Sequence, residues 1–134
     1  MQLKLDMMGI ITSKFAEMKN FYRDSLGMEV VFEMSDNYVE FKHPGIRFAI
    51  STNEVMSQVT KHKSYTEAKQ GQALELAFIV DSPAEVDSTY TELLEKGATA
   101  VTSPDDMPWG QRAAFFADPD GNIHEIFCNL PQSS

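Results

Sequence analysis

The sequence PWGQRAAFFADPDGNIHEIF, residues 108–127, decides the fold. Two apolar-rich runs flank Asp-Pro-Asp-Gly-Asn at 118–122, a pattern that predicts a β-hairpin. Pro119 sets the backbone for the turn and Gly121 supplies a left-handed residue, so we expect a three-residue loop with a bulge at Gly121. Glu125 then lies in the middle of the second strand, where a charge must face a cavity, a partner or water.

The hairpin completes the second of two similar units. In the first unit we expect a strand at 7–12, a helix with its N-cap at Ser13, and strands at 28–34, 38–42 and 47–51. The second unit repeats this order, with a strand at 74–80, a helix capped by Ser82 and Glu85, and a strand at 98–102 before the hairpin. The second unit is longer by about six residues, which we expect in a loop at 103–109.

Two βαβββ units predict an α+β protein with two curved mixed sheets around a pocket, each sheet covered by helix on its convex side. We expect a single domain made of module 1 (residues 1–52), a polar connector (53–72) and module 2 (73–134).

The composition narrows the class of protein. The chain has 134 residues and a formal net charge of −9, which argues against nucleic acid as a partner. Its single cysteine, Cys128, forms no internal disulfide and fits a reducing cytoplasm. No stretch has the length and hydrophobicity of a membrane span. We therefore expect a cytoplasmic protein with no nucleic-acid or membrane partner.

Several short motifs carry a resemblance to a known family: Phe21-Tyr22, Leu26-Gly27, Ala77–Asp81, Lys96-Gly97, Pro108–Gly110 and Asp118–Glu125. With them the chain resembles the vicinal oxygen chelate superfamily, which includes glyoxalase I, extradiol dioxygenases, fosfomycin-resistance enzymes and bleomycin-resistance proteins. The resemblance covers nearly the whole chain except the connector. It implies paired modules that often assemble between chains, so a homodimer is expected. It does not select one activity, because one fold hosts several chemistries.

The resemblance also implies four ligand positions, one on the first and one on the last strand of each unit. They correspond here to Met7, Ala49, Glu75 and Glu125. Metal-using members place His, Gln or Glu at such positions. A thioether is a poor ligand for Mg²⁺, Mn²⁺ or Zn²⁺, and a methyl group is no ligand. No metal or other cofactor is therefore expected. Glu75 and Glu125 are the residual metal candidates, and a divalent metal is the alternative.

Strand alternation points both glutamates into the expected pocket. The two carboxylates repel each other, so a metal, a protein cation, a basic ligand or a proton held at a raised pKa must offset their charge. The expected pocket residues are Met7, Ala49, Glu75, Trp109, Gln111, Phe115, Glu125 and Phe127.

The hairpin register decides what accompanies Glu125. Gln111 and Phe115 share its face under the three-residue loop, whereas Arg112 and Ala114 share it under a four-residue loop. Trp109 is either a hydrophobic lid over core residues or an aromatic wall for a planar or cationic ligand.

The three histidines are weaker candidates for chemistry. His43, in a turn, and His62, in the connector, are expected to be solvated. His124 alternates with Glu125, so it should face the helix as a structural histidine.

We therefore predict a metal-independent binding protein for a drug-like or metabolite-like small molecule that is cationic or aromatic. One alternative is a divalent-metal-dependent glyoxalase-like lyase or dioxygenase. Another is a cofactorless isomerase or lyase with Glu75 or Glu125 as the catalytic base, which a strongly raised pKa on one of them would favour. Whether the protein is an enzyme is left open at this point.

Overall fold

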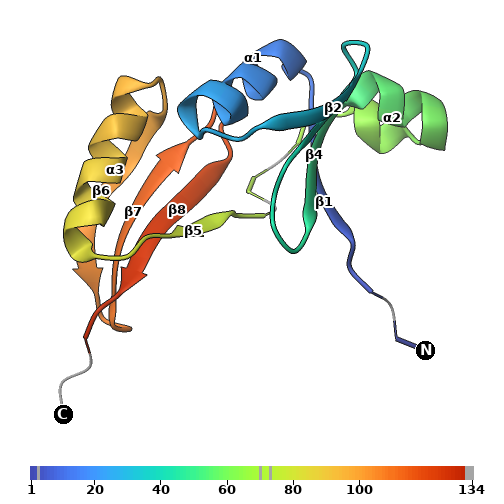
Figure 1. The fold of residues 1–134 in the computed structure, drawn as a ribbon. Coiled ribbons are helices and arrows are strands. Elements are labelled where there is room, and N and C mark those ends of the chain that lie inside the picture. Colours follow the sequence, from blue (N-terminus) through green and yellow to red (C-terminus); the bar gives the residue numbers. More distant parts are fainter. Residues whose placement is uncertain (3, 70, 73, 132–134) are drawn as a thin grey trace. The chain divides into compact units, whose positions relative to one another are not determined.

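The computed structural model describes residues 1–2, 4–69, 71–72 and 74–131. The expectations for residues 3, 70, 73 and 132–134, at the ends of the predicted modules and connector, lie outside the described residues. The chain divides into two compact units, Met1–Gln70 and Gly71–Ser134. Each unit contains one four-stranded mixed sheet (Figure 1).

The first unit has the element order β-α-β-β-β. Its elements are β1 (Met7–Thr12), α1 (Phe15–Asn20), the π-helical turn η1 (Phe21–Ser25), β2 (Val30–Met34), β3 (Tyr38–Phe41) and β4 (Arg47–Thr52). β1 and β4 are parallel, and the other pairs are antiparallel, so the strands lie in the order β1-β4-β3-β2.

The second unit repeats this topology. Its elements are β5 (Ala77–Ile79), α3 (Pro83–Glu95), β6 (Thr99–Met107), β7 (Gln111–Ala117) and β8 (Ile123–Asn129). The strands lie in the order β5-β8-β7-β6, again with one parallel pair at the edge. The predicted α+β class and the two βαβββ units are confirmed.

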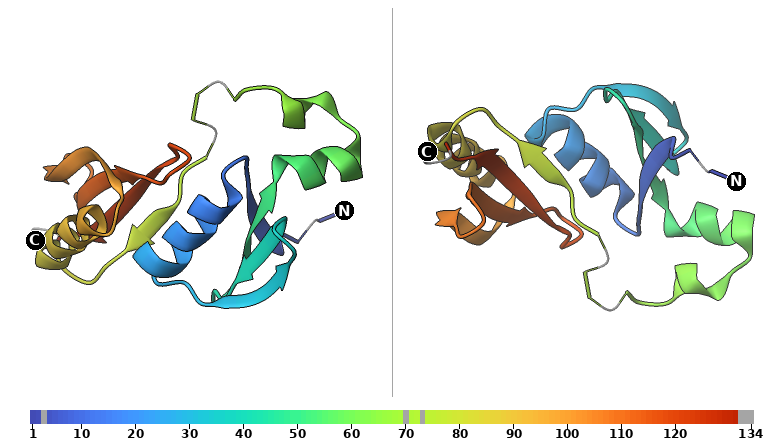
Figure 2. Two further views of the ribbon diagram at one scale, coloured as in Figure 1. Left: turned by 90° about the horizontal axis from the view of Figure 1, so that it is seen from above. Right: turned by 90° about the horizontal axis from the view of Figure 1, so that it is seen from below.

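Each unit has a hydrophobic core between its main helix and one sheet face. α3 lies along one face of its sheet in both views of Figure 2, where it contacts β6, β7 and β8. The buried side chains of the first unit include Phe15, Met18, Phe21, Tyr22, Phe41, Phe48 and Ile50. Those of the second unit include Leu76, Val86, Tyr90, Leu93, Phe116, Ile126 and Cys128. Burial of each large apolar side chain stabilises the fold by about 2 kcal/mol.

The connector is structured and packs with the first unit. It contains the helix α2 (Asn53–Thr60) and the short 3-10 helix η2 (Lys63–Thr66). The Thr52 hydroxyl caps α2 by accepting a hydrogen bond of 3.0 Å from the Val55 N–H. Further along, Lys69 Nζ donates a hydrogen bond of 3.2 Å to the Ile11 carbonyl in β1. That the whole chain forms one domain stays a prediction.

The two main helices begin differently. In α3, Ser82 Oγ accepts a hydrogen bond of 3.1 Å from the Glu85 N–H, which confirms the expected cap. The expected cap at Ser13 is wrong, because α1 has Lys14 at its N-cap position and no side-chain cap there. The Lys14 N–H instead donates 2.9 Å to the hydroxyl of Thr12, which is buried at the end of β1. The helix thus starts one residue later than the sequence suggests.

The extra residues of the second unit form strand rather than loop. The expected loop at 103–109 is wrong, because β6 continues to Met107 and pairs there with Gln111. The pairing of β6 with β7 shifts register twice between Ala100 and Asp105, and these shifts accommodate the extra residues of β6. The turn itself is confined to 108–110, closed by Gly110 with φ of +87°. Continued pairing satisfies backbone groups that a long loop would expose.

The helix caps give a first testable expectation. Ser82→Ala should lower the free energy of unfolding by about 1 kcal/mol, because it removes the oxygen that accepts the first-turn N–H. The matched change Ser13→Ala should cost much less, since Ser13 caps no helix. Urea unfolding followed by circular dichroism measures both. Equal losses from the two substitutions would contradict the assignment of the caps.

Candidate functional site

The hairpin turn has the geometry expected from its sequence. The Gly121 N–H donates 2.9 Å to the Asp118 carbonyl, and the Asp118 N–H donates 3.0 Å to the Asn122 carbonyl. Gly121 has φ of +84°, which favours glycine at this position. This is the predicted three-residue loop with a bulge at Gly121.

The turn fixes which side chains share a face with Glu125. Phe115 lies directly opposite Glu125 in the β7–β8 pair, and Ala77 lies opposite it in the β5–β8 pair. Arg112 pairs with Cys128 and so belongs to the other face. Its guanidinium forms ion pairs with Asp87 of α3 at 2.9 Å and with Asp106 at 3.0 Å. The three-residue register is therefore confirmed, and Arg112 does not neutralise Glu125.

The face of the second sheet opposite α3 is called here the Glu125 face. Its side chains come from all four strands of the sheet and from the segment before β5: Glu75, Ala77, Ile79, Thr99, Thr102, Asp105, Met107, Gln111, Ala113, Phe115, Ile123, Glu125 and Phe127. Apart from Glu75, Glu125 and Asp105, these side chains are uncharged, and most are apolar. Phe115, Glu125 and Phe127 are half-buried, while Glu75 is exposed.

Glu75 and Glu125 lie side by side on this face. Partial burial, a hydrogen bond that protonated Glu125 donates to the Glu75 carboxylate and the charge of Glu75 together raise the pKa of Glu125 from 4.5 to about 7. β5 and β7 flank Glu125 with Ala77 and Phe115, so neither neighbouring strand offers it a cation at these positions. The structure thus brings the two predicted carboxylates together, and Glu125 holds its proton up to about neutral pH.

Trp109 lies at the tip of the β6–β7 hairpin. Its side chain is 62% exposed, and its Nε1–H donates 2.9 Å to Gln111 Oε1. Gln111 Nε2 in turn donates 3.0 Å to Asn129 Oδ1, which fixes the orientation of the indole. Gln111 is four residues from Phe115 along β7, about 13 Å in an extended strand. Trp109 is therefore no lid over the core; it lies toward the end of the Glu125 face.

The other two expected ligand positions lie on the first sheet. Ala49 in β4 is buried and pairs with Gly9 of β1 and Glu40 of β3. Met7 in β1 is 38% exposed, and the Tyr38 hydroxyl lies 3.5 Å from its sulfur. That these residues form one pocket with the Glu125 face stays a prediction.

A polar cluster beside Ala49 was not predicted from the sequence. Glu40 accepts hydrogen bonds from the Tyr38 hydroxyl at 2.9 Å and from Arg47 Nη2 at 2.6 Å. Arg47 also pairs with Asp6 at 2.8 Å. The hydrogen bonds from Arg47 and Tyr38 lower the pKa of Glu40. The available signal was the alternation of Tyr38 with Glu40 and of Arg47 with Ala49, which places all four on one face.

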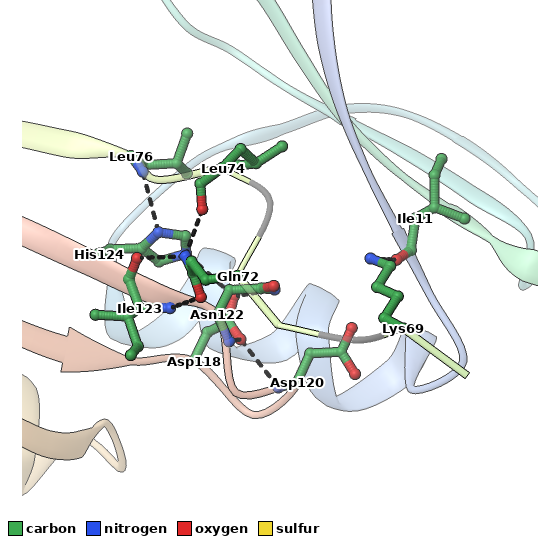
Figure 3. Close-up of polar contacts among 10 residues, drawn as sticks. All are labelled: Ile11, Lys69, Gln72, Leu74, Leu76, Asp118, Asp120, Asn122, Ile123 and His124. Atoms are coloured by element: carbon green, nitrogen blue, oxygen red, sulfur yellow. Dashed lines mark hydrogen bonds and ion pairs between the residues drawn. The ribbon is translucent and has the colours of Figure 1, made fainter.

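The histidines are placed as expected. His43 and His62 are exposed, and His124 is fully buried on the face that α3 covers. His124 Nδ1 accepts 3.1 Å from the Leu76 N–H, so Nε2 carries the proton and donates 3.2 Å to Asp118 Oδ2 (Figure 3). These partners support the structural interpretation of His124.

A metal fits these residues poorly. Among residues 1–2, 4–69, 71–72 and 74–131, no three His, Cys, Asp or Glu side chains gather into a group that could hold an ion. At the four positions that the resemblance implies, Met7 and Ala49 add a thioether and a methyl group to the two carboxylates. Such a set falls short of the three or four hard ligands that a divalent metal site needs.

No helix in the described part of the chain is long and apolar enough to cross a membrane.

Comparison with known proteins extends the resemblance. Residues 4–126 match the model of the glyoxalase/bleomycin resistance protein/dioxygenase superfamily. The uncharacterized protein YraH of Bacillus subtilis (strain 168) is 30% identical over 128 residues, covering 93% of this chain and 98% of YraH.

Two solved structures have the same fold. A glyoxalase/bleomycin resistance protein/dioxygenase from Nocardioides superposes with a TM-score of 0.87 at 24% identity, covering 100% of this chain and 88% of that one. A family enzyme from Burkholderia phytofirmans PsJN gives a TM-score of 0.85 at 20% identity, covering 96% and 100%. The chain belongs to the glyoxalase/bleomycin resistance protein/dioxygenase superfamily.

Proposed function

We propose that this protein binds a small molecule without a metal, and that the Glu125 face of the second sheet recognises it. The supporting observation is the Glu75–Glu125 pair. No arginine or lysine neutralises it from the flanking strand positions, which hold Ala77 and Phe115. A ligand cation or hydrogen-bond donor placed between the two carboxylates relieves their repulsion. Phe115 and Phe127 on the same face favour a ligand with a flat apolar part.

The binding protein is proposed to be a cytoplasmic homodimer. Neither the homodimer nor the location carries the argument for ligand recognition, which rests on the second sheet alone.

A second candidate function is acid–base catalysis without a cofactor. One observation favours it: a carboxyl with a pKa of about 7 exchanges protons readily at neutral pH, as a general base must. Glu125 would then take a proton from a bound carbon acid, while Glu75 tunes its basicity. A metal-dependent lyase or dioxygenase is less well supported, because Met7 and Ala49 supply no hard ligand.

Binding of a planar aromatic cation tests the proposal. Proflavine should bind about tenfold more weakly at about pH 6 than at about pH 8, because it must displace the proton that Glu125 holds below its pKa. Glu125→Gln should weaken binding at about pH 8 by about tenfold and abolish the pH dependence. Calorimetry measures both effects. The control Glu95→Gln, on exposed α3 surface, should leave them unchanged. Equal affinity of Glu125→Gln and the wild type would overturn the proposal.

The same pair predicts how stability varies with pH. In the unfolded chain Glu125 loses its proton near pH 4.5, whereas in the folded chain it keeps the proton up to about pH 7. Its favourable contribution is therefore complete below the unfolded pKa and is lost as the pH rises through about 7. The neutral side chain of Glu125→Gln does not titrate. The free energy of unfolding of this variant should rise relative to the wild type between about pH 5 and about pH 8. A difference that stays constant over this range, measured by urea unfolding, would contradict the raised pKa.

Metal content gives an independent test. Purified protein should carry no stoichiometric transition metal, and a chelator should leave its thermal midpoint unchanged, because the donor set is too small. Elemental analysis and a thermal melt with and without chelator measure this. A stoichiometric metal that is lost in Glu75→Gln and Glu125→Gln would favour the metal-dependent alternative.

A further inference from the structure

Glu75 lies outside the regular strands of the second sheet. β5 begins at Ala77, so the described residues before it, 72 and 74–76, belong to no ladder that holds them against β8. One backbone bond is made there, from the Glu125 N–H to the Leu76 carbonyl at 2.9 Å. Since the pairing of Glu75 with Glu125 depends on where this segment lies, the side chains that tie it down determine the geometry of the proposed site.

His124 provides the first of these ties. Its Nδ1 accepts the Leu76 N–H, which is the peptide group immediately after Glu75. The ring cannot turn to release this bond without breaking the contact of Nε2 with Asp118, and all three side chains involved are buried in the core. Edge-on contacts with the rings of Phe116 and Phe78, at centroid distances of 5.8 and 6.4 Å, further restrict the imidazole.

Gln72 provides the second tie, on the other side of Glu75. Its Oε1 accepts 3.1 Å from the Ile123 N–H, and its Nε2 donates 2.9 Å to the Ile123 carbonyl. The side-chain amide therefore bonds to β8 as the backbone of a neighbouring strand would (Figure 3). Nε2 also donates to the Leu74 carbonyl, which closes the segment back on itself.

We propose that His124 and Gln72 are positioning residues, which anchor the segment on both sides of Glu75 and hold its carboxylate beside Glu125. The two ties flank Glu75 at Leu76 and at Leu74. His124 lies in the core under α3, and the Gln72 amide bonds to backbone groups of Ile123, so neither needs to touch a ligand. The inference takes its functional meaning from the proposed ligand site, but its test does not require a ligand.

Two replacements of His124 separate positioning from packing. His124→Asn keeps an oxygen near the position of Nδ1, where it can accept the Leu76 N–H. His124→Gln instead keeps a donor near the position of Nε2, toward Asp118, and loses that acceptor. Both variants remove the ring from between Phe116 and Phe78, so both should destabilise the fold. The Glu125 pKa, read by carbon NMR of the carboxyl group, should fall by about one unit in His124→Gln and much less in His124→Asn.

A milder variant tests the second tie if either histidine variant does not fold. Gln72 is exposed, so Gln72→Ala should leave the core intact while it frees residues 72 and 74 from β8. The Glu125 pKa should again fall by about one unit, because Glu75 no longer stays beside it. The matched control is Gln58→Ala on exposed α2 of the first unit, which should leave that pKa unchanged.

The outcomes distinguish this inference from the proposed function. A Glu125 pKa that is unchanged in folded Gln72→Ala, or that shifts equally in His124→Gln and His124→Asn, overturns the positioning role. If the pKa shifts as expected but wild-type protein does not bind proflavine, the positioning role holds and the ligand proposal fails. Where both hold, Gln72→Ala should also weaken proflavine by about threefold or more at about pH 8.

Discussion

The second unit depends on the buried carboxylate of Asp118. Its Oδ1 accepts 3.0 Å hydrogen bonds from the backbone N–H groups of Asp120 and Asn122, and its Oδ2 accepts from the Asn122 side chain at 2.9 Å and from His124. Because a carboxylate in the core must be satisfied by donors, the turn can close in few ways. The turn then sets the register of β7 against β8, and the register sends Glu125 and Arg112 to opposite faces.

The Asp118 carboxylate also affects the position of Glu75, through His124. Through Nε2 it fixes the imidazole of His124, and the other ring nitrogen holds the peptide group next to Glu75. One side chain in the turn thereby influences both glutamates, one through strand register and the other through a hydrogen-bonded ring. Such an arrangement helps to keep two like charges together, since the backbone beside Glu75 cannot move away from β8 without breaking buried hydrogen bonds.

The sequence predicted what local chemistry determines. The turn residues 118–122 fix their own geometry, and Ser82 followed by Glu85 fixes a helix start, so the hairpin and α3 followed from short patterns. The three-residue loop was the better fit to the sequence, and the pairing of Phe115 with Glu125 decides for it. Features that depend on tertiary partners were missed. Thr12 rather than Ser13 meets the start of α1 because β1 ends in a buried position, and Glu40 acquires Arg47 through strand pairing. Gln72 resembled any polar connector residue, because its partner is the backbone of Ile123, distant in sequence.

The two sheets treat their glutamates in opposite ways. In the first sheet, Arg47 and Tyr38 lower the pKa of Glu40. The charge of Glu40 is therefore neutralised within the unit and needs no ligand cation. In the second sheet, Glu125 has a raised pKa and a negative neighbour, so its ionised form has an unfavourable interaction in the folded chain. A group that destabilises its own fold in this way is typical of a functional site. Because the proton on Glu125 leaves near neutral pH, the pair presents one negative charge or two, and a bound cation selects the second state. This coupling between proton and ligand, rather than the shared βαβββ scaffold, gives the second sheet a chemistry that the first sheet lacks.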